Sequence, residues 1–415
     1  MRVFAAVLPL FLLAFPAAAQ VIRVPQDQPT IQQAINAATN GTTILVAPGT
    51  YTQLLTVSAK TLTIRGEGGA AVTTLQANNG RALTLSSGAV VTLENFTVRP
   101  QFTPAMAGIM VTSSTLHLRA CVLRDSQAPS GAALQLSGAS QATVSSCEFL
   151  SNSATNFGGA ISVVNNGALV VHNSAFRQNS SGIAGGAIDL QPGTAALANC
   201  LFANNSSANG GALATVSTGS SFRNCTLVGN SSGPGVGYAV AVAGIFSNAV
   251  ALHNSIVWGN TGGAHTSALG STSSGTTFLV TYSDVQGGHP GPGNISADPS
   301  FAPGGSPSDY RPGPGSPCID AGDNAMAPAD TLDLDNDLNT SESLPIDLGG
   351  EPRFVDDPQA PNTGQGPGPV VDMGARERQP PATCPADFNG DSSITTGDFS
   401  AFLSAWFQAV SGGCP

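Results

Sequence analysis

The heptapeptide Asn173-Ser174-Ala175-Phe176-Arg177-Gln178-Asn179 decides the fold, because close copies of it recur through the middle of the chain. Successive closing asparagines are 27, 26, 25 and 30 residues apart. A second marker, Gly-Gly-Ala followed by Ile or Leu, keeps the same rhythm, and such a period indicates a repeat architecture. The other copies of the heptapeptide begin at Ser146, Asn199, Asn224 and Asn254, and the glycine marker begins at Gly158, Gly185 and Gly210.

Each unit contains three short alternating strands separated by turns of glycine, asparagine and serine. Three strands in about 26 residues form one coil of a right-handed parallel β-helix, in which each strand pairs with its counterpart about 4.8 Å away in the next coil. A β-propeller would need longer blades, and a leucine-rich solenoid would need a denser leucine pattern. The sequence therefore predicts an all-β, right-handed parallel β-helix solenoid.

Identical positions of successive coils stack in such a fold. We expect two asparagine columns whose side chains hydrogen-bond along the stack. We also expect phenylalanines to stack inside the coil, and a column of cysteines and serines to point inward beside them. The first asparagine column is Asn173, Asn199, Asn224 and Asn254; the second is Asn152, Asn179, Asn205, Asn230 and Asn260; the inward residues are Phe149, Phe176, Phe202, Cys147, Ser174, Cys200 and Cys225.

The N-terminal region predicts secretion and a capped solenoid. Arg2, an apolar run over residues 3–15 and small residues up to Ala19 are typical of a secretory signal, residues 1–19, cleaved between Ala19 and Gln20. That apolar run is too short to span a bilayer, and no later stretch reaches the required length. Residues 30–38 have helical spacing with Thr30 as the N-cap, and a helix there would cap the open end of the solenoid. We therefore expect an extracellular or cell-surface protein with no transmembrane segment in its mature chain.

Charge is unevenly distributed. The formal net charge is −11, and 18 of the 25 acidic residues lie from Asp298 onward. No basic stripe is present to neutralise phosphates, which excludes a nucleic-acid partner. Between residues 107 and 262 the only acids are Asp125, Glu148 and Asp189, and no column of the coil holds two carboxylates. Because glycoside hydrolysis needs two carboxyl groups roughly 5–10 Å apart, no catalytic residue is assigned.

The repeats resemble known β-helix proteins. Residues 22–378 resemble the pectin-lyase-like superfamily, and the Gly-Gly-Ala-Ile and Phe-x-x-Asn units resemble bacterial polymorphic outer-membrane proteins. The stretches Ser316-Pro317-Cys318-Ile319-Asp320 and Asp372-Met373-Gly374-Ala375 resemble the last coil of secreted β-helix proteins. The resemblance implies a β-helix over residues 20–300, a C-terminal β-helix end with an Asp-rich insert over 301–378, and a surface that cleaves or binds acidic polysaccharides.

The Asp-rich insert offers carboxylates at alternate positions, Asp333, Asp335 and Asp337. That spacing suits a hard cation such as Ca²⁺. It lacks the glycine and the twelfth-position acid of a complete EF-hand loop. A possible second calcium site and a solvated acidic loop are both compatible with this pattern.

After a linker at residues 379–383, residues 384–415 predict a small calcium module. Counted from Asp387, the positions 1, 3, 5, 7 and 12 of a calcium loop hold Asp387, Asn389, Asp391, Ser393 and Asp398. Phe399, Phe402, Leu403, Trp406 and Phe407 then form one apolar helix face. This half EF-hand, followed by Gly413-Cys414, resembles a dockerin-like anchor, although dockerins carry two such repeats.

Cysteine positions complete the sequence-based predictions. Thirty residues bury little core, so we expect a disulfide between Cys384 and Cys414 that brackets the module. Stacked cysteines in neighbouring coils are too far apart for a disulfide and are expected to be buried thiols.

We interpret the chain as a secreted, non-catalytic β-helix surface or matrix protein, anchored or displayed through a Ca²⁺-binding dockerin-like module. Its partner would be a cohesin-like or cell-surface receptor. The alternative is a polysaccharide lyase, hydrolase or glycan-binding protein with a polysaccharide partner.

Overall fold

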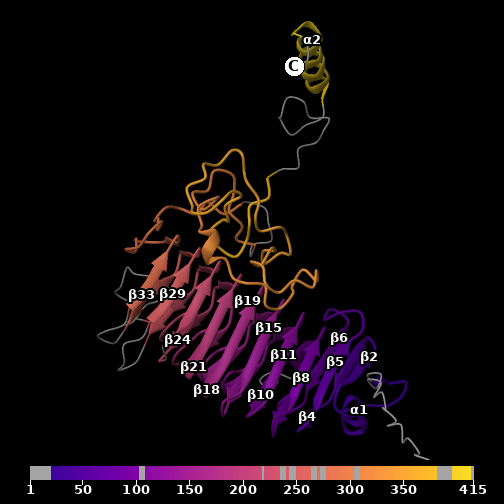
Figure 1. The fold of residues 1–415 in the computed structure, drawn as a ribbon. Helices are drawn as coiled ribbons and strands as arrows, with labels where there is room; N and C mark the ends of the chain where they lie inside the picture. The colour runs from indigo at the N-terminus through magenta and orange to yellow at the C-terminus, as the bar shows by residue number, and fades with distance from the viewer. Residues whose placement is uncertain are drawn as a thin grey trace, which may run out of the picture.

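The computed structural model describes residues 20–101, 108–216, 219–233, 240–242, 249–262, 269–271, 277–302, 309–380 and 395–412. Within these ranges the chain forms the predicted all-β, right-handed parallel β-helix solenoid. Its named strands all pair in parallel, each with its counterpart in the next coil, and Figure 1 shows them as a row of near-parallel arrows. No described helix is long and apolar enough to cross a membrane.

The coil has four successive strand positions, which stack into three sheets. The first and second positions belong to an 18-stranded sheet because two long strands, β18 (Ile161–His172) and β21 (Ile188–Ala198), run through both. The other strands at the first position are β4 (Leu55–Ser58), β7 (Leu83–Ser86), β10 (Ile109–Thr112), β14 (Leu134–Ser137), β24 (Leu213–Thr215), β28 (Val240–Val242) and β32 (Leu269–Ser271). Those at the second position are β1 (Val21–Val24), β2 (Thr42–Val46), β5 (Thr61–Gly66), β8 (Val90–Glu94), β11 (Thr115–Arg119), β15 (Gln141–Ser145), β25 (Ser220–Arg223), β29 (Ala249–His253) and β33 (Thr277–Thr281).

The third and fourth positions form separate sheets of ten and six described strands. The ten-stranded sheet, hereafter the third sheet, contains β3 (Gly49–Thr52), β6 (Thr73–Ala77), β9 (Thr97–Pro100), β12 (Val122–Arg124), β16 (Glu148–Leu150), β19 (Ala175–Arg177), β22 (Leu201–Ala203), β26 (Thr226–Val228), β30 (Ile256–Trp258) and β34 (Asp284–Val285). The six-stranded sheet contains β13 (Gln127–Ser130), β17 (Ser153–Phe157), β20 (Ser180–Ser181), β23 (Ser206–Ser207), β27 (Ser231–Ser232) and β31 (Thr261–Gly262).

The interior of the coil confirms the predicted stacking of aromatic rings. The rings of Phe149, Phe176 and Phe202 stack with centroids 4.7 and 4.8 Å apart and planes within 6°. These separations equal the spacing of paired strands, so the stack follows directly from strand register. Five cysteines of the described chain are free and buried, as expected of inert thiols: Cys121, Cys147, Cys200, Cys225 and Cys318.

The asparagine column that closes each heptapeptide is the predicted buried ladder. The side-chain amides of its first four members each donate to the Oδ1 of the asparagine one coil on, and Asn179 Nδ2 lies 3.0 Å from Asn205 Oδ1. The same Nδ2 donates to Phe149 O, and the backbone N–H of Asn179 donates to Asn205 Oδ1. The ladder therefore pairs backbone groups that the turn would otherwise leave buried and unpaired.

The other asparagine column does not form the predicted ladder. Asn173, Asn199, Asn224 and Asn254 occupy the corner between the second and third strand positions with φ between 46° and 51°. Among these four, only Asn254 donates to a neighbour of the column, Asn224 Oδ1, at 3.5 Å. Asparagine tolerates this left-handed conformation better than most residues, which accounts for its recurrence here. Their amide nitrogens instead donate to backbone oxygens of the C-terminal segment.

A short helix caps the N-terminal end of the solenoid, as predicted. Helix α1 (Ile31–Ala37) begins after Thr30, whose hydroxyl accepts a hydrogen bond from Gln33 N. The helix buries Ile31, Ala34 and Ile35 against the first coils. At its other end the Lys60 ammonium donates to Ile35 O, Asn36 O and Ala38 O, and so satisfies carbonyls that have no partner within the helix.

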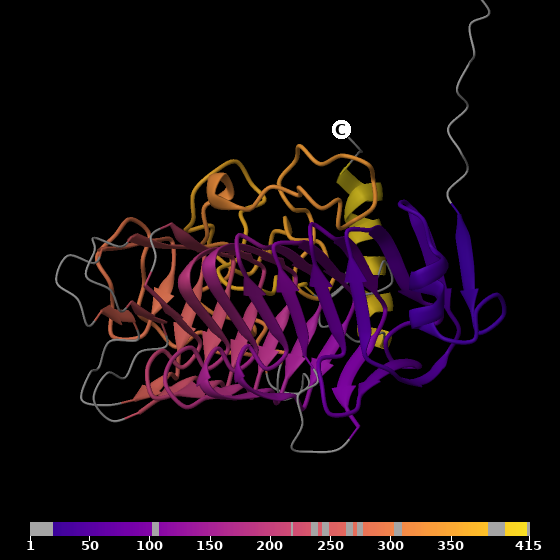
Figure 2. The ribbon, with the colours of Figure 1, turned by 90° about the horizontal axis from the view of Figure 1, so that it is seen from below.

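Residues 301–378 are hereafter called the acidic segment, and their described part lies along one side of the solenoid (orange in Figure 2). Their described part has one short 3₁₀ helix, η1 (Asn324–Met326), and otherwise irregular backbone with isolated bridges. Phe301, Tyr310 and Leu348 pack on an outward apolar patch of the third sheet made of Ala175, Leu201, Ala203 and Val228. At the far end of the chain, helix α2 (Thr396–Gly412) confirms the predicted C-terminal helix.

Candidate functional site

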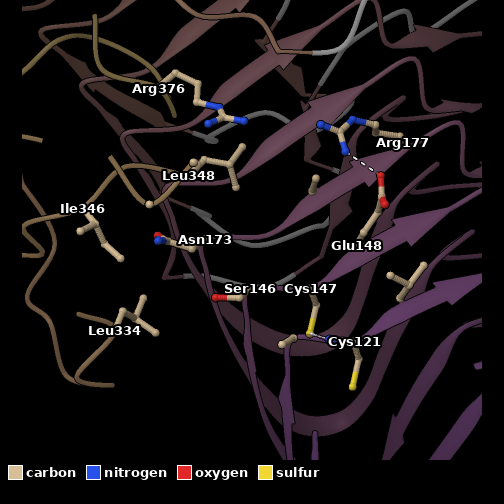
Figure 3. Close-up of a pocket in the computed structure, with 15 residues that line it drawn as sticks. Cys121, Ser146, Cys147, Glu148, Asn173, Arg177, Leu334, Ile346, Leu348 and Arg376 are labelled. Carbon is tan, nitrogen blue, oxygen red and sulfur yellow. Dashed lines mark hydrogen bonds and ion pairs between the residues drawn. The ribbon is translucent and has the colours of Figure 1, made fainter. Parts of the chain in front are cut away.

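The acidic segment leaves an open cleft where it meets the third sheet (Figure 3). The cleft has a volume of about 550 Å³. Its floor comes from the outer sides of β12, β16 and β19 and from the corner residues before them, and its opposite wall comes from residues 334–350 and Arg376. The corner asparagines hold this wall in place, because Asn173 Nδ2 donates to Asp347 O at 3.0 Å and Asn199 Nδ2 to Ile346 O at 2.7 Å.

Two guanidinium groups converge in the cleft from opposite walls, Arg177 from β19 and Arg376 from the acidic segment (Figure 3). Arg177 Nη1 lies 2.6 Å from Glu148 Oε1, and Arg376 Nη2 lies 2.8 Å from Asp309 Oδ1. Glu148 is the only carboxylate among the lining residues. Each guanidinium is thus paired with one carboxylate and has further N–H groups, and two such donor groups facing one space favour a hydrogen-bond acceptor between them.

The remaining lining combines apolar and polar groups. Leu334, Ile346 and Leu348 supply an apolar wall, while Ser146 and Asn173 supply polar side chains at the floor. Such a mixture suits a molecule with both C–H faces and hydroxyl groups. A cysteine nucleophile is not available here, because burial, and then hydrogen bonding with Cys121, raises the pKa of the Cys147 thiol well above its ordinary value.

Gly349 leaves room for the Arg376 guanidinium in the cleft. A Cβ on this residue would lie 1.7 Å from Arg376 Nη1. Its own amide N–H donates to Asp347 Oδ1 at 2.6 Å, which fixes the turn beside the arginine. Any side chain at position 349 would therefore displace the Arg376 guanidinium.

The acidic loop directly beside the cleft contains the predicted second calcium site. The structure brings Asp333, Asp335 and Asp337 together, with one carboxylate oxygen of each within 4.8 Å of the others. Asp330, Asp335 and Glu342 form an overlapping group at the same separation. Leu334 lies between two of these aspartates in sequence and lines the cleft, so the cluster and the apolar wall share one loop. Oxygen ligands at these distances fit Ca²⁺, and its binding here stays a prediction.

The loop has hydrogen bonds of its own that fix its shape. Leu334 N donates to both carboxylate oxygens of Asp330, and Leu338 N donates to Asp333 Oδ1. Burial, followed by the charges of Asp335 and Asp333, raises the pKa of Asp330. A bound cation would lower that pKa again, because it stabilises the ionised carboxylate.

The other predicted site residues lie mostly outside the described residues. This applies to the loop positions Asp387, Asn389, Asp391 and Ser393, to the cysteines Cys384 and Cys414, and to Ala19. Gln20 is the first described residue, and its Oε1 accepts a hydrogen bond from Thr42 Oγ1 at 2.9 Å. Asp398 lies in the first turn of α2, 2% exposed, and its Oδ2 accepts a hydrogen bond from Thr395 N.

Sequence reasoning missed Arg376, Gly349 and the apolar wall of the cleft. Arg376 directly follows the stretch Asp372–Ala375 that resembles the last coil of secreted β-helix proteins, and this was the one signal available. The strand pattern places Arg177 at the end of β19 but does not indicate what its side chain faces. The pairing of Arg177 with Arg376 depends on how a distant segment folds back, which no periodicity encodes.

The fold and the cleft define a β-solenoid protein with an added C-terminal cover. A family model for the right handed beta helix region matches residues 62–231 and, in an overlapping match, residues 107–279, which together span just over half of the chain. The chain belongs to this right-handed β-helix family. The comparison with curated proteins gives no match.

Solved structures with a similar chain path include pectin methylesterases from three organisms. The Aspergillus niger enzyme is 14% identical with a TM-score of 0.39, over 68% of this chain and 87% of that chain. The enzyme PemA of Erwinia chrysanthemi is 13% identical with a TM-score of 0.37, over 67% and 91%. The Yersinia enterocolitica enzyme is 14% identical with a TM-score of 0.35, over 61% and 90%. These identities and scores are too low to carry a substrate or an activity to this chain.

Proposed function

We propose that this protein is a secreted, non-catalytic β-helix protein that binds an anionic polysaccharide in the cleft between the third sheet and the acidic segment. The convergence of Arg177 and Arg376 on one space carries this proposal. Arginine forks pair well with the carboxylate of a uronate. The apolar wall of Leu334, Ile346 and Leu348 would pack on the C–H face of the sugar ring.

Binding is favoured over cleavage by the composition of the cleft. Glu148 is its only lining carboxylate, and that group is paired with Arg177 at 2.6 Å. A hydrolase needs an acid and a second carboxylate as base or nucleophile. Release of reducing or unsaturated ends from an anionic polysaccharide would contradict the non-catalytic proposal.

Calcium has two proposed roles. Ca²⁺ at Asp333, Asp335 and Asp337 would neutralise the acidic loop beside the cleft and reduce its repulsion of an anionic ligand. Ca²⁺ at the C-terminal loop, with Asp398 as its last ligand, would order the dockerin-like module that anchors the protein to a cohesin-like or other surface receptor.

The test is a binding measurement with the full chain on polygalacturonate and, as a neutral control, galactan. We expect polygalacturonate to bind, galactan to bind weakly, and salt to weaken the first. Arg376→Gln should lower the affinity about tenfold, within the range of a lost charged hydrogen bond. Gly349→Ala should lower the affinity by a similar factor, because the new side chain moves the Arg376 guanidinium without removing it.

Thr194→Leu provides a matched control for these variants, because Thr194 is an exposed residue of β21 that does not line the cleft. Its affinity for polygalacturonate should equal that of the wild-type protein. Equal binding of polygalacturonate by the wild-type, Arg376→Gln and Gly349→Ala proteins would show that the cleft is not the site. Added Ca²⁺ should strengthen binding, and an Asp335→Asn variant should lose that gain.

A further inference from the structure

A second pocket lies on the other side of the corner, against the outer face of the 18-stranded sheet. Ala198 of β21 is paired in register with His172 of β18 on one side and with Arg223 of β25 on the other. Because alanine is small, the sheet surface has a notch at this point, with His172 and Arg223 at its two ends. The two ends are roughly 10 Å apart, twice the spacing of paired strands.

A second small residue on β21 keeps the notch open, and the acidic segment covers it. Ala196, next outward along β21, lies between Val170 and Ser221 and is also small. Pro328, Ala329 and Thr331 of the acidic segment cover the opposite side. The pocket is open to solvent and has a volume of about 370 Å³.

The polar groups of the notch are placed for a ligand. His172 is only 6% exposed, and its Nδ1 has no hydrogen-bond partner among the described residues. Burial lowers its pKa to about 4, so the imidazole is neutral near pH 7 and offers one donor and one acceptor nitrogen. Because His172 lines the pocket, a bound group meets this neutral imidazole there.

Arg223 supplies the only formal charge of the pocket lining near pH 7. Its Nη1 donates to Met326 O at 3.2 Å, which orients the guanidinium. His253 follows it in register and is held by Thr281 Oγ1 at 2.7 Å from its Nδ1. No carboxylate is among the residues that line the pocket.

We infer that this notch is a second binding site, which takes one hydroxylated carboxylate of the size of a single uronate residue. The carboxylate would pair with Arg223, and a ring hydroxyl would hydrogen-bond to the His172 imidazole at the other end. The separation of the two ends excludes a bare carboxylate as a bridging ligand, and the sides formed by Val170, Ala196 and Pro328 suit a ring. The inference does not depend on the cleft, which is formed by a different sheet.

The experiment titrates the full chain with glucuronate and measures binding by calorimetry, together with the imidazole resonances of His172 by NMR. Glucose, which lacks the carboxylate, and acetate, which lacks the ring, are the matched probes. We expect glucuronate to bind and to shift the His172 resonances, and we expect glucose and acetate to bind at least about tenfold more weakly.

Ala198→Leu fills the notch and keeps both polar partners, so it should abolish binding of glucuronate. Arg223→Gln is a second variant that leaves the notch empty and removes the charge, and it should weaken binding about tenfold. Thr194→Leu, on the same strand but outside the notch, should bind like the wild-type protein. Arg376→Gln reports on the cleft and should also leave glucuronate binding and the His172 shift unchanged.

Three outcomes would overturn the inference. These are the absence of glucuronate binding by the wild-type protein, unchanged binding by the folded Ala198→Leu and Arg223→Gln variants, and loss of binding in Arg376→Gln alone. The last result would assign the sugar to the cleft, whereas failure of polygalacturonate binding with intact glucuronate binding would reject only the proposed cleft function.

Discussion

The two asparagine columns have the same residue at the same sequence rhythm, yet they contribute to the structure in different ways. Asn179 and its equivalents point into the coil and bond along its axis. Asn199 and its equivalents stand at a left-handed corner and bond outward to the acidic segment. The inner column therefore stabilises the solenoid itself, and the outer column attaches the segment that forms both pockets.

The largest effect should come from breaking the inner column. Replacing Asn205 by leucine removes its four side-chain hydrogen bonds, which are made with Asn179 N, Asn179 Nδ2, Asn230 Oδ1 and Phe176 O. A typical hydrogen bond contributes about 1 kcal/mol, so the free energy of unfolding in urea should fall by about 4 kcal/mol. Asn204→Gly is the control, because Asn204 is exposed at φ 56°, which glycine adopts freely, and it should change stability by less than about 0.5 kcal/mol. Equal effects of the two changes would refute the ladder as a source of stability.

The contrast between the columns shows what a sequence pattern can predict. Alternation in heptapeptides such as residues 173–179 fixes which side chains point inward, so the coil, the phenylalanine stack and the inner asparagines were predictable. It does not give the sign of φ at a corner, and that sign turns Asn199 outward. Arg353 and Glu377 were not predictable as a buried pair, because their environment comes from the folding of an irregular segment.

The attached segment has a buried ion pair. Arg353 and Glu377 are both fully buried and lie 3.3 Å apart, and Arg353 Nη2 also donates to Ala375 O at 2.9 Å. Arg353→Met would leave Glu377 without its cation, at a cost of about 3 kcal/mol. We expect this destabilisation to open the segment locally. Hydrogen exchange of residues 344–377 should become faster, while exchange in the phenylalanine stack should not change. Adding Glu377→Gln to the Arg353→Met variant should restore part of the protection from hydrogen exchange. A uniform increase in exchange would instead show that the acidic segment and the solenoid unfold as one unit.

We expect the stability of the acidic segment to depend on pH, because two of its carboxyl groups have raised pKa values. Burial, and then the nearby charge of Asp320, raises the pKa of Asp372 to about 7, while burial raises that of Asp320 to about 6. A carboxyl with a raised folded-state pKa binds its proton more tightly when folded, so the stability that it contributes falls as pH rises from its unfolded value towards 7. Between pH 5 and pH 7 the acidic segment should lose about 2 kcal/mol from Asp372 alone. Hydrogen exchange, corrected for its intrinsic pH dependence, measures this loss of stability. In the Asp372→Asn variant the stability of the acidic segment should change less between pH 5 and pH 7.

The smallest predicted effect concerns a single attachment of the outer column. Asn199→Gly keeps the left-handed backbone at φ 50° and removes only the hydrogen bond to Ile346 O. The free energy needed to detach the acidic segment locally from the solenoid should fall by about 1 kcal/mol. Asn199→Ala removes the same bond and also places a Cβ in the left-handed region, which should add about 1 kcal/mol. The difference between the two variants therefore isolates the backbone term, and hydrogen exchange near residue 346 measures both. If glycine and alanine prove equally disruptive, the corner conformation is not the reason for asparagine here. If neither affects exchange near residue 346, the outer column does not hold the acidic segment on the solenoid.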